Sequence, residues 1–572
     1  MELFLNKPLS ITGEQTMSKP WLQSYPEGVP TEISIDEYAS VADIFDQSVC
    51  RYEDLPAYSN FGKTLNYKEV KEYTSKIGAY LIHELGLAKG TRVAVMMPNL
   101  LQNPVAIFGI LRAGLVVVNT NPLYTARELR HQMIDSGAEA IIIVDNFCHV
   151  LEQVIEKTPI KHVIITRMGD MLPFPKSAII NFVVKRVKKM VPDYHLPGAV
   201  SFKNALKLGS QHRFETVPTN HYDIAFLQYT GGTTGISKGA VLTNKNMVAN
   251  MQQASAWIHN IMEEGKETII TALPLYHIFS LTANCLTFMK YGALNYLITN
   301  PRDMKNFVKE LKGVKFTAFT GVNTLFNGLL NTPGFRDIDF SSLKLTLGGG
   351  MAVQRAVAEH WKNVTGSPLL EAYGLTETSP AACINPLNMK NFNGKIGLPI
   401  SSTDCSIQND DWNELPIGET GEICIRGPQV MQGYWKRPKE TSEVLSADGW
   451  LHTGDIGFMD EQGYVQIVDR KKDMILVSGF NVYPNEIESV LVHHPGVLEV
   501  GVIGMPDEKS GEAVAAIVVK SDPTLTEDAL IEFCKTDLTN YKRPRYVFFA
   551  DELPKTNVGK ILRRELRDKY VH

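Results

Sequence analysis

The segment of residues 227–239, LQYTGGTTGISKG, constrains the fold more than any other part of the chain. Its glycines free the backbone to turn N–H groups inward, while hydroxyls and one lysine add further donors. Because no carboxylate stands among them, the loop suits a polyphosphate. Its candidate ligands are Thr230, Gly231, Gly232, Thr233, Thr234, Gly235, Ser237 and Lys238. The apolar, partly β-branched flanks predict strand–loop–strand, and the alternative is a plain Gly/Thr-rich hairpin turn.

Composition narrows the class of protein. With 572 residues the chain is too long for one hydrophobic core, so we expect at least two domains. A net charge of −5 gives no global basic field, which argues against nucleic acid as a partner. Seven scattered cysteines without a C-x-x-C pair favour a reducing compartment and argue against structural zinc. The N-terminus lacks a signal-peptide pattern, and Met17 offers a second start, so residues 1–16 form a candidate dispensable extension.

Strand and helix patterns alternate on both sides of the glycine loop. Residues 91–99 and 138–146 resemble buried strands with a helical pattern between them, which predicts parallel α/β layers. A second alternating block covers about 268–384. Short strands broken by Gly and Asp over 395–468 predict a small β-rich subdomain. The basic region 160–215 looks irregular, and we expect surface structure there.

A charged run, DRKKD at residues 469–473, marks a change in character. Beyond it, strands and amphipathic helices form a compact α+β pattern, including a helix capped by Thr526 and continuing through Asp537. A charged linker before about 100 residues is typical of a small domain on a hinge. The predicted fold class is therefore α/β, with a large N-terminal domain over 1–470 and a small, mobile α+β domain over 471–572.

Two apolar stretches bear on membrane contact. Residues 273–289 are uncharged but contain Pro274 and fall short of the ~20 apolar residues that a span needs, so we expect a buried segment. Residues 177–191, SAIINFVVKRVKKMV, would place apolar side chains beside four basic ones if helical. That combination suits an anionic bilayer surface. An ordinary solvated basic helix is the open alternative.

Several short motifs carry groups that a nucleotide needs. YGLTET at 373–378 puts an aromatic ring, hydroxyls and a carboxylate at a strand end, where they could contact a base, a phosphate and Mg²⁺. Glycines 348–350 permit close approach of a planar ligand, and Asp455 in WLHTGD can accept ribose hydroxyls. Lys560 in PKTNVGK precedes a basic helix. Each motif alone has an ordinary alternative: an exposed turn, a capping aspartate or a solvated lysine.

Taken in order, YTGGTTGISKG, YGLTET, WLHTGD, DRKKD and PKTNVGK resemble the motifs of the adenylate-forming enzymes. That superfamily includes acyl-CoA synthetases, firefly-type luciferases and peptide-synthetase adenylation domains. The resemblance covers the chain from about Trp21 to Tyr570. Within the superfamily, residues 449–488 look like a bacterial long-chain fatty-acyl-CoA synthetase.

The resemblance implies two half-reactions, with ATP, Mg²⁺ and coenzyme A as cofactors. A carboxylate attacks the α-phosphate of ATP to give acyl-AMP and pyrophosphate, and the thiol of coenzyme A then expels AMP. The implied catalytic residues are Lys560, Lys238, Thr376 and Glu377. The implied metal-facing residues are Thr230 and Glu377. The nucleotide residues it implies beyond the glycine loop are Gly349, Gly350, Tyr373, Gly374, Thr376, Asp455 and Arg470.

The resemblance also implies how the two steps are separated. The small domain would rotate about Lys472, withdraw Lys560 and present Gly479 beside the pantetheine arm. His277 and Leu281 would lie where the acyl tunnel narrows, and a packed structural role for His277 is equally open. Some long-chain relatives carry a tryptophan gate here, but no tryptophan follows His277, so the gating stays open.

The leading hypothesis is a long-chain-fatty-acid–CoA ligase of fatty acid metabolism and beta-oxidation. It would be cytoplasmic and peripherally attached to the inner face of the cell membrane, with small-molecule substrates and no nucleic acid. A homodimer is an open alternative for its assembly. The competing functions are a medium-chain or aryl acid CoA ligase, luciferase-like oxidation of the adenylate, and a non-catalytic acyl-binding transport partner.

Overall fold

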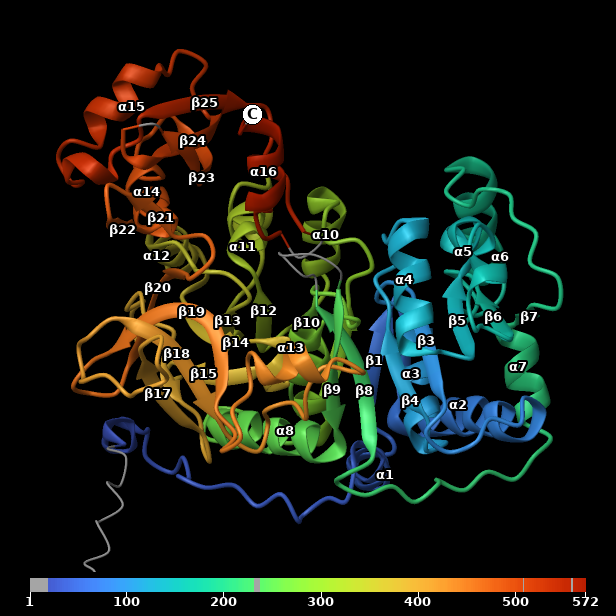
Figure 1. Ribbon diagram of the computed structural model, residues 1–572. Coiled ribbons are helices and arrows are strands. Elements are labelled where there is room, and N and C mark those ends of the chain that lie inside the picture. The colour runs from blue at the N-terminus through green and yellow to red at the C-terminus, as the bar shows by residue number, and fades with distance from the viewer. Residues whose placement is uncertain (1–18, 231–236, 508, 557–558, 572) are drawn as a thin grey trace, which may run out of the picture.

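The computed structural model describes residues 19–230, 237–507, 509–556 and 559–571. A large body holds two extended sheets and a smaller antiparallel sheet, and a C-terminal lobe stands on one side of it (Figure 1). The arrangement confirms the predicted α/β class with a large N-terminal and a small C-terminal domain.

A seven-stranded sheet with the order β7-β6-β5-β3-β4-β8-β9 builds the first half of the body. Its strands are β3 (Arg92–Met96), β4 (Val116–Asn119), β5 (Ala140–Val144), β6 (His162–Thr166), β7 (Val200–Ser201), β8 (Ile224–Thr230) and β9 (Lys238–Thr243). All neighbours are parallel except β8 and β9. The parallel order confirms the predicted strands within 91–99 and 138–146, because crossover helices must connect them. Those helices are α3 (Gln102–Arg112) and α4 (Ala126–Ser136).

The expectation of irregular structure over residues 160–215 was wrong. That region contributes β6 and β7 to the sheet and also forms α6 (Lys176–Phe182), the π-helix η5 (Val183–Val187) and α7 (Phe202–Gly209). Helix α5 (Cys148–Glu152) precedes it. The strand β6 is flanked by Lys161 and Arg167, so its apolar centre is masked by basic neighbours in the sequence.

The second sheet has nine strands in the order β16-β15-β14-β13-β12-β10-β11-β1-β2. The strands are β1 (Pro56–Asn60), β2 (Lys63–Asn66), β10 (Thr268–Thr271), β11 (Leu294–Leu297), β12 (Ala318–Gly321), β13 (Leu345–Gly348), β14 (Leu369–Gly374), β15 (Ala381–Ile384) and β16 (Leu398–Pro399). Helices α9 (Thr287–Lys290), α10 (Met304–Leu311), α11 (Asn323–Leu330) and α12 (Arg355–Thr365) belong to this half. Helices α1 (Val41–Arg51), α2 (Tyr67–Ala79) and α8 (Asn244–Ile258) also contact elements of the first half. Strands β10 to β14 are parallel, so their carboxyl ends share one edge.

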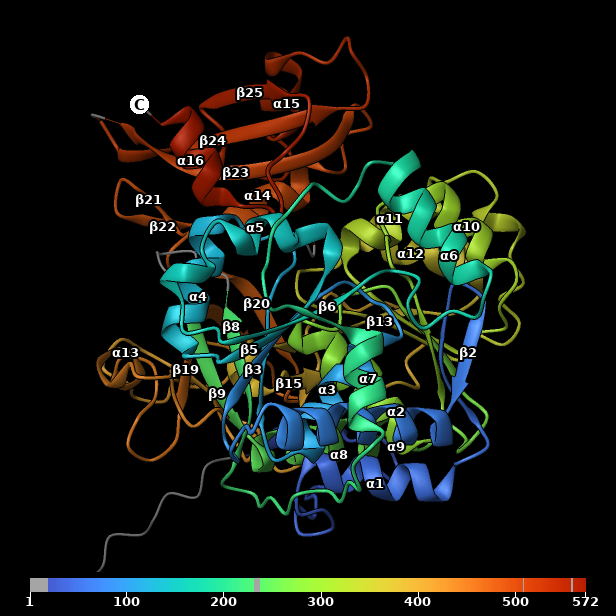
Figure 2. The same cartoon turned by 90° about the vertical axis from the view of Figure 1, so that its right-hand side faces the viewer.

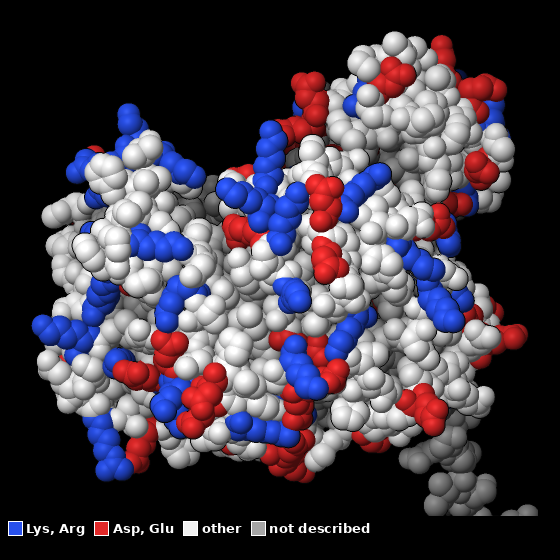
Figure 3. All heavy atoms as spheres, turned by 180° about the vertical axis from the view of Figure 1, so that it is seen from behind, with Lys and Arg blue, Asp and Glu red and all other residues white. Residues whose placement is uncertain are grey.

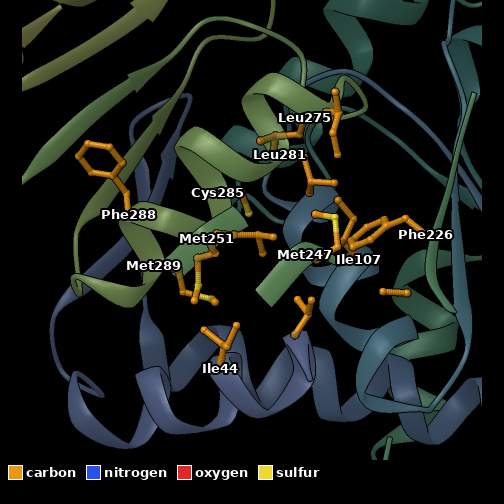
Figure 4. Close-up of a cluster of buried hydrophobic side chains, with 14 of the residues drawn as sticks. Ile44, Ile107, Phe226, Met247, Met251, Leu275, Leu281, Cys285, Phe288 and Met289 are labelled. Carbon is orange, nitrogen blue, oxygen red and sulfur yellow. The ribbon is translucent and has the colours of Figure 1, made fainter. Parts of the chain in front are cut away.

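The largest core lies where helices from both halves meet (Figure 4). Ile44 of α1, Ile107 of α3 and Met251 of α8 converge there with Leu281 and Cys285. The last two belong to the π-helix η6 (Ser280–Leu286), which continues into α9. The uncharged segment at 273–289 is therefore largely buried, as predicted. No helix in the described part of the chain is long and apolar enough to cross a membrane.

The predicted β-rich subdomain is a four-stranded antiparallel sheet formed by β17 (Asp404–Gln408), β18 (Gly421–Arg426), β19 (Leu451–Met459) and β20 (Val465–Arg470). A short helix, α13 (Pro438–Ser442), lies between β18 and β19 in the chain. Strand β20 ends at Arg470, so the chain leaves this sheet at the charged run.

The C-terminal lobe is an α+β unit. Its strands are β21 (Ile475–Val477), β22 (Phe480–Val482), β23 (Val497–Asp507), β24 (Gly511–Lys520) and β25 (Tyr546–Ala550). Its helices are α14 (Pro484–Leu491), α15 (Glu527–Phe533) and α16 (Arg563–Tyr570). The side chain of Thr526 accepts from the Ala529 N–H, which confirms the predicted cap, but α15 ends at Phe533 rather than continuing to Asp537.

Candidate functional site

The glycine-rich segment connects the two antiparallel strands β8 and β9, as predicted. Thr230 pairs with Lys238 across this hairpin. Residues 231–236, which include Gly231, Gly232, Thr233, Thr234 and Gly235, lie outside the described residues. The Ser237 carbonyl lies 2.9 Å from the His131 Nε2 on α4, which ties the hairpin to the first sheet's helices.

Glu377 lies directly beside this hairpin, in the 3₁₀ turn η8 (Thr376–Thr378) that follows β14. Its Oε1 accepts a 2.7 Å hydrogen bond from the Tyr434 hydroxyl. The Lys238 Nζ lies over the same tyrosine ring, 5.0 Å from its centroid. The hairpin's lysine, an aromatic ring and the carboxylate of YGLTET therefore form one cluster.

The predicted ribose and adenine residues converge on a second cluster. The buried Asp455 carboxylate accepts a 2.7 Å bond from the Tyr373 hydroxyl through Oδ2, and its Oδ1 lies 3.1 Å from the Arg470 Nε. Asp455 and Arg470 face each other across β19 and β20. Burial, followed by the Asp455 charge, raises the pKa of Tyr373 well above its usual value, so the phenol stays a donor.

Glycines shape the edge at which these side chains meet. The Gly349 N–H donates to the Gly321 carbonyl at the ends of β13 and β12, and Gly350 has φ +77°, a backbone region that favours glycine. A Cβ on Gly374 would lie 1.9 Å from the Pro380 carbonyl oxygen, so only glycine fits the turn before Thr376. The strand ends thus offer backbone surface to a flat ligand.

Lys560 reaches this region from the C-terminal lobe. Its loop precedes α16, and a Cβ on Gly559 would lie 2.2 Å from the Thr324 Oγ1 at the start of α11, so the loop is seated on the large body. Burial, followed by the nearby Arg470 charge, lowers the pKa of Lys560 to about 7, and Asp455 partly opposes the shift. An amine that loses its proton so readily is in an electropositive, partly dehydrated place.

His277 adjoins the same lysine. Burial, followed by the Lys560 charge, lowers the pKa of its imidazole to about 4, so His277 is neutral at physiological pH. Its Nδ1 accepts from the Phe279 N–H at 3.3 Å, a contact within its own turn. Leu281 lies one turn further on and is fully buried in the core of Figure 4.

The predicted hinge residue Lys472 and the predicted coenzyme A residue Gly479 lie outside the two clusters described above. Burial, followed by repulsion from Arg470, lowers the pKa of Lys472 to about 8. Gly479, with φ +84°, lies in the exposed β21–β22 hairpin, and apart from its chain neighbours no described residue lies within 4 Å of its Cβ position. The structure brings Lys472 toward the ribose cluster but does not bring Gly479 there.

Two adjoining cavities mark the cleft between these groups. One of 310 Å³ is lined by Thr453, Gly454, Arg470, Lys471 and Lys472. The other, of 280 Å³, shares Thr453, Gly454 and Lys471 and extends to Glu377 and Tyr434. The two clusters therefore face a continuous hollow.

Sequence reasoning missed Tyr434. It lies in the sequence MQGYWKRP, between strands β18 and β19. Its only distinctive local feature is that two aromatic residues, Tyr434 and Trp435, follow a glycine. Its importance comes from its contacts with Glu377, 57 positions away, and Lys238, 196 positions away, and a local sequence pattern cannot reveal such contacts.

Comparison with known proteins gives the same two-part division. A family model described as AMP-binding enzyme matches residues 45–435, and one described as AMP-binding enzyme C-terminal domain matches residues 486–560. The chain is 58% identical over 556 residues to the long-chain-fatty-acid–CoA ligase of Escherichia coli O6:H1, covering 97% of this chain and 98% of the relative. The corresponding ligase of Bacillus subtilis is 39% identical, covering 96% and 98%.

Solved structures agree on the fold. ATP-bound MatB from Rhodopseudomonas palustris is 27% identical with a TM-score of 0.79, covering 92% of this chain and 99% of that one. The anthranilate CoA ligase AuaEII in complex with anthranoyl-AMP reaches a TM-score of 0.83 at 24% identity, covering 94% and 99%. At that identity the second likeness concerns the fold alone.

Proposed function

Because the chain belongs to the AMP-binding enzyme family, we propose that it is an ATP-dependent long-chain-fatty-acid–CoA ligase. The observation that carries the proposal is the seating of the Lys560 loop on the large body, next to Asp455 and Arg470. A cation beside a carboxylate of the kind that binds ribose is what adenylation of an acid requires, since two anions have to meet there.

In the first half-reaction the fatty acid carboxylate displaces pyrophosphate from the α-phosphate of ATP. Asp455, held by Tyr373 and Arg470, would accept the ribose hydroxyls, and the backbone of Gly349 and Gly350 would face the adenine. Lys238 would neutralise the outer phosphates. Lys560 would lie between the carboxylate and the α-phosphate, where negative charge concentrates in the transition state, and Thr376 would donate to that phosphate.

Magnesium fits the residues at the hairpin. Mg²⁺ prefers hard oxygen ligands and keeps few protein contacts when it accompanies a nucleotide. Glu377 uses Oε1 for Tyr434, and among the described residues no hydrogen bond is made to its Oε2; the Thr230 hydroxyl lies on the adjoining strand. We propose that Thr230 and Glu377 hold the ion, which would supply charge neutralisation on the phosphates.

In the second half-reaction the thiol of coenzyme A attacks the acyl carbonyl and AMP leaves. In the proposed site Lys560 would occupy the space that the thiol needs, so it would have to withdraw first. We propose that residues 471–572 pivot at Lys472, and that the same motion brings Gly479 toward the site. A glycine there would let the pantetheine arm pass beside the backbone.

Release of AMP with a series of fatty acids tests the proposal. Each buried CH₂ contributes about 0.8 kcal/mol, so kcat/KM should rise up to about fourfold per added carbon until the acyl site is full. We expect saturated acids of long chain to be preferred over medium-chain and aryl acids, and AMP release to require coenzyme A for multiple turnovers. A preference for aryl acids, light emission, or no ATP-dependent product would contradict it.

The finer proposal of peripheral membrane contact rests on the projection formed by residues 173–190. Five of its large apolar side chains are exposed, Phe174 being 86%, Phe182 61% and Val187 64% accessible. The same stretch carries five basic side chains and no acid. Basic side chains gather on the corresponding projection in Figure 3, and Figure 2 shows α6 standing at the outer face of the body. Apolar tips among basic side chains suit an anionic lipid surface, from which a long-chain acid would be drawn.

Vesicle sedimentation tests this surface. Replacing Lys185, Arg186, Lys188 and Lys189 with Glu should abolish binding to phosphatidylglycerol vesicles and leave turnover of detergent-dispersed fatty acid unchanged. Each neutralised basic residue is worth about 1 kcal/mol near such a surface. Reversal of the exposed Arg213 and Lys266 elsewhere on the chain is a control with half the change in charge. The proposal would be contradicted if the variant with four substitutions bound the vesicles as well as the wild type, or if the control variant lost binding to the same extent.

A further inference from the structure

The segment Met431–Trp435 connects the two parts of the proposed phosphate site. Its backbone pairs with β9: the Val241 N–H donates to the Gly433 carbonyl at 2.9 Å, and the Trp435 N–H donates to the Gly239 carbonyl at 2.8 Å. On its other side, the Met431 N–H donates 2.8 Å to the Glu377 carbonyl. One short segment thus holds both the strand that begins at Lys238 and the turn that carries Glu377.

The Tyr434 side chain repeats this connection. Its ring lies under the Lys238 ammonium and its hydroxyl donates to the Glu377 Oε1. The tyrosine is itself held, because its N–H donates to the Thr441 Oγ1 at 2.9 Å and the residue pairs with Ala240. A half-buried ring fixed by its own backbone can orient the flexible groups that it contacts.

Charge explains why such a residue is needed. Lys238 and Glu377 have opposite charges and lie on neighbouring elements, and a direct ion pair between them would occupy both groups needed for ligands. Interposed between them, the tyrosine satisfies the cation with its π face and the carboxylate with its hydroxyl.

We propose that Tyr434 is a positioning residue that keeps Lys238 and Glu377 apart and aims the free Glu377 oxygen at the metal that accompanies the triphosphate. The inference rests on the proposed function. Carboxylate ligands are commonly oriented by a hydrogen bond to their other oxygen, and losing such a partner weakens metal affinity by about tenfold or more.

The ring and the hydroxyl can be tested separately. Tyr434→Phe keeps the ring under Lys238 and removes the bond to Glu377, whereas Tyr434→Leu removes both. The probe is α,β-methylene-ATP, which cannot transfer its adenylyl group, and its affinity is measured by calorimetry in excess Mg²⁺ and in EDTA. We expect Tyr434→Phe to weaken binding by about tenfold in Mg²⁺ and to leave binding in EDTA unchanged. Tyr434→Leu should weaken binding in both.

Tyr464, which lies in the turn between β19 and β20, supplies the matched control. Like Tyr434 it has a lysine over its ring, with the Lys395 Nζ 5.3 Å from the ring centroid. Tyr464→Phe and Tyr464→Leu should change neither affinity. A purely structural role for Tyr434 would lower the affinity equally in Mg²⁺ and in EDTA, and that result would overturn the proposal. So would wild-type affinity of Tyr434→Phe in Mg²⁺.

Glu377→Gln separates failure of this inference from failure of the proposed function. If Glu377→Gln weakens binding only in Mg²⁺ and Tyr434→Phe adds nothing to it, the two residues act together as proposed. If Glu377→Gln weakens binding in Mg²⁺ and Tyr434→Phe does not, the positioning role of Tyr434 is wrong, and Glu377 remains a metal ligand. If Glu377→Gln has no effect, both the metal assignment and the role of Tyr434 are wrong.

Discussion

The large body and the C-terminal lobe contribute to the site in different ways. The body's groups are fixed several times over: Asp455 is held by Tyr373 and Arg470, and Glu377 by Tyr434 and by the backbone of Met431. The lobe contributes Lys560, whose loop rests on the body by the contact of Gly559 with Thr324. Under the proposed function, the body would hold a ligand in one place, while the lobe would deliver a charge and remove it.

Removing the delivered charge should have the largest effect. We expect Lys560→Ala to slow acyl-adenylate formation by at least about 10²-fold, because a cation aimed at developing charge contributes several kcal/mol. Thioester formation from supplied acyl-AMP should continue. Pyrophosphate exchange and single-turnover CoA acylation measure the two steps.

Lys472→Pro is the converse variant, since proline removes the backbone freedom that a pivot needs. It should impair thioester formation more than adenylation. Equal loss of both steps in either variant would remove the distinction between a holding body and a delivering lobe.

The pH dependence of adenylation should come from the lobe. The pKa of Lys560 is lowered to about 7, so the charged form is present below pH 7 and is lost as the pH rises. Because kcat/KM for ATP reports the free enzyme, it should fall about tenfold per pH unit well above pH 7. In Lys560→Arg the residual rate should lose this decline, because a guanidinium stays charged. An unchanged profile in Lys560→Arg would assign the titration to another group.

A single contact within the body should matter least. Tyr373→Phe removes the 2.7 Å bond to Asp455 but leaves Arg470 in place. We expect ATP binding to weaken by about 1 kcal/mol, or about fivefold, as for one hydrogen bond in a partly redundant set. Calorimetry with the same non-transferable ATP analogue measures it. A loss of ATP affinity of about 10²-fold or more would contradict this prediction, because it would show that Arg470 alone cannot hold Asp455 in place.

The sequence predicted local features of this site better than its long-range contacts. The hairpin around Thr230 and Lys238 was predictable, because glycines between β-branched flanks specify strand–loop–strand. Tyr434 was not, because its partners come from β9 and from the turn after β14. The bond from Tyr373 to Asp455 likewise joins residues 82 positions apart.

The same inability of local patterns to predict long-range contacts explains the errors in the predicted fold. Strand β6 was overlooked because basic residues flank it in the sequence, and its pairing with β5 establishes it as a strand. Helix α15 stops at Phe533 although its polar pattern continues, since tertiary packing decides where a helix ends. Motifs whose chemistry is contained in a few consecutive residues were recoverable, and geometry created by folding was not.

The seat of Gly559 on Thr324 has a kinetic consequence. The glycine has φ +82°, and a methyl group there would meet the Thr324 hydroxyl at 2.2 Å, so the loop or Thr324 would have to shift. If the lobe pivots as proposed, each catalytic cycle separates and re-forms this contact once. A substitution as small as Gly559→Ala would then shift the balance between the two halves of the cycle without altering any group that touches a substrate.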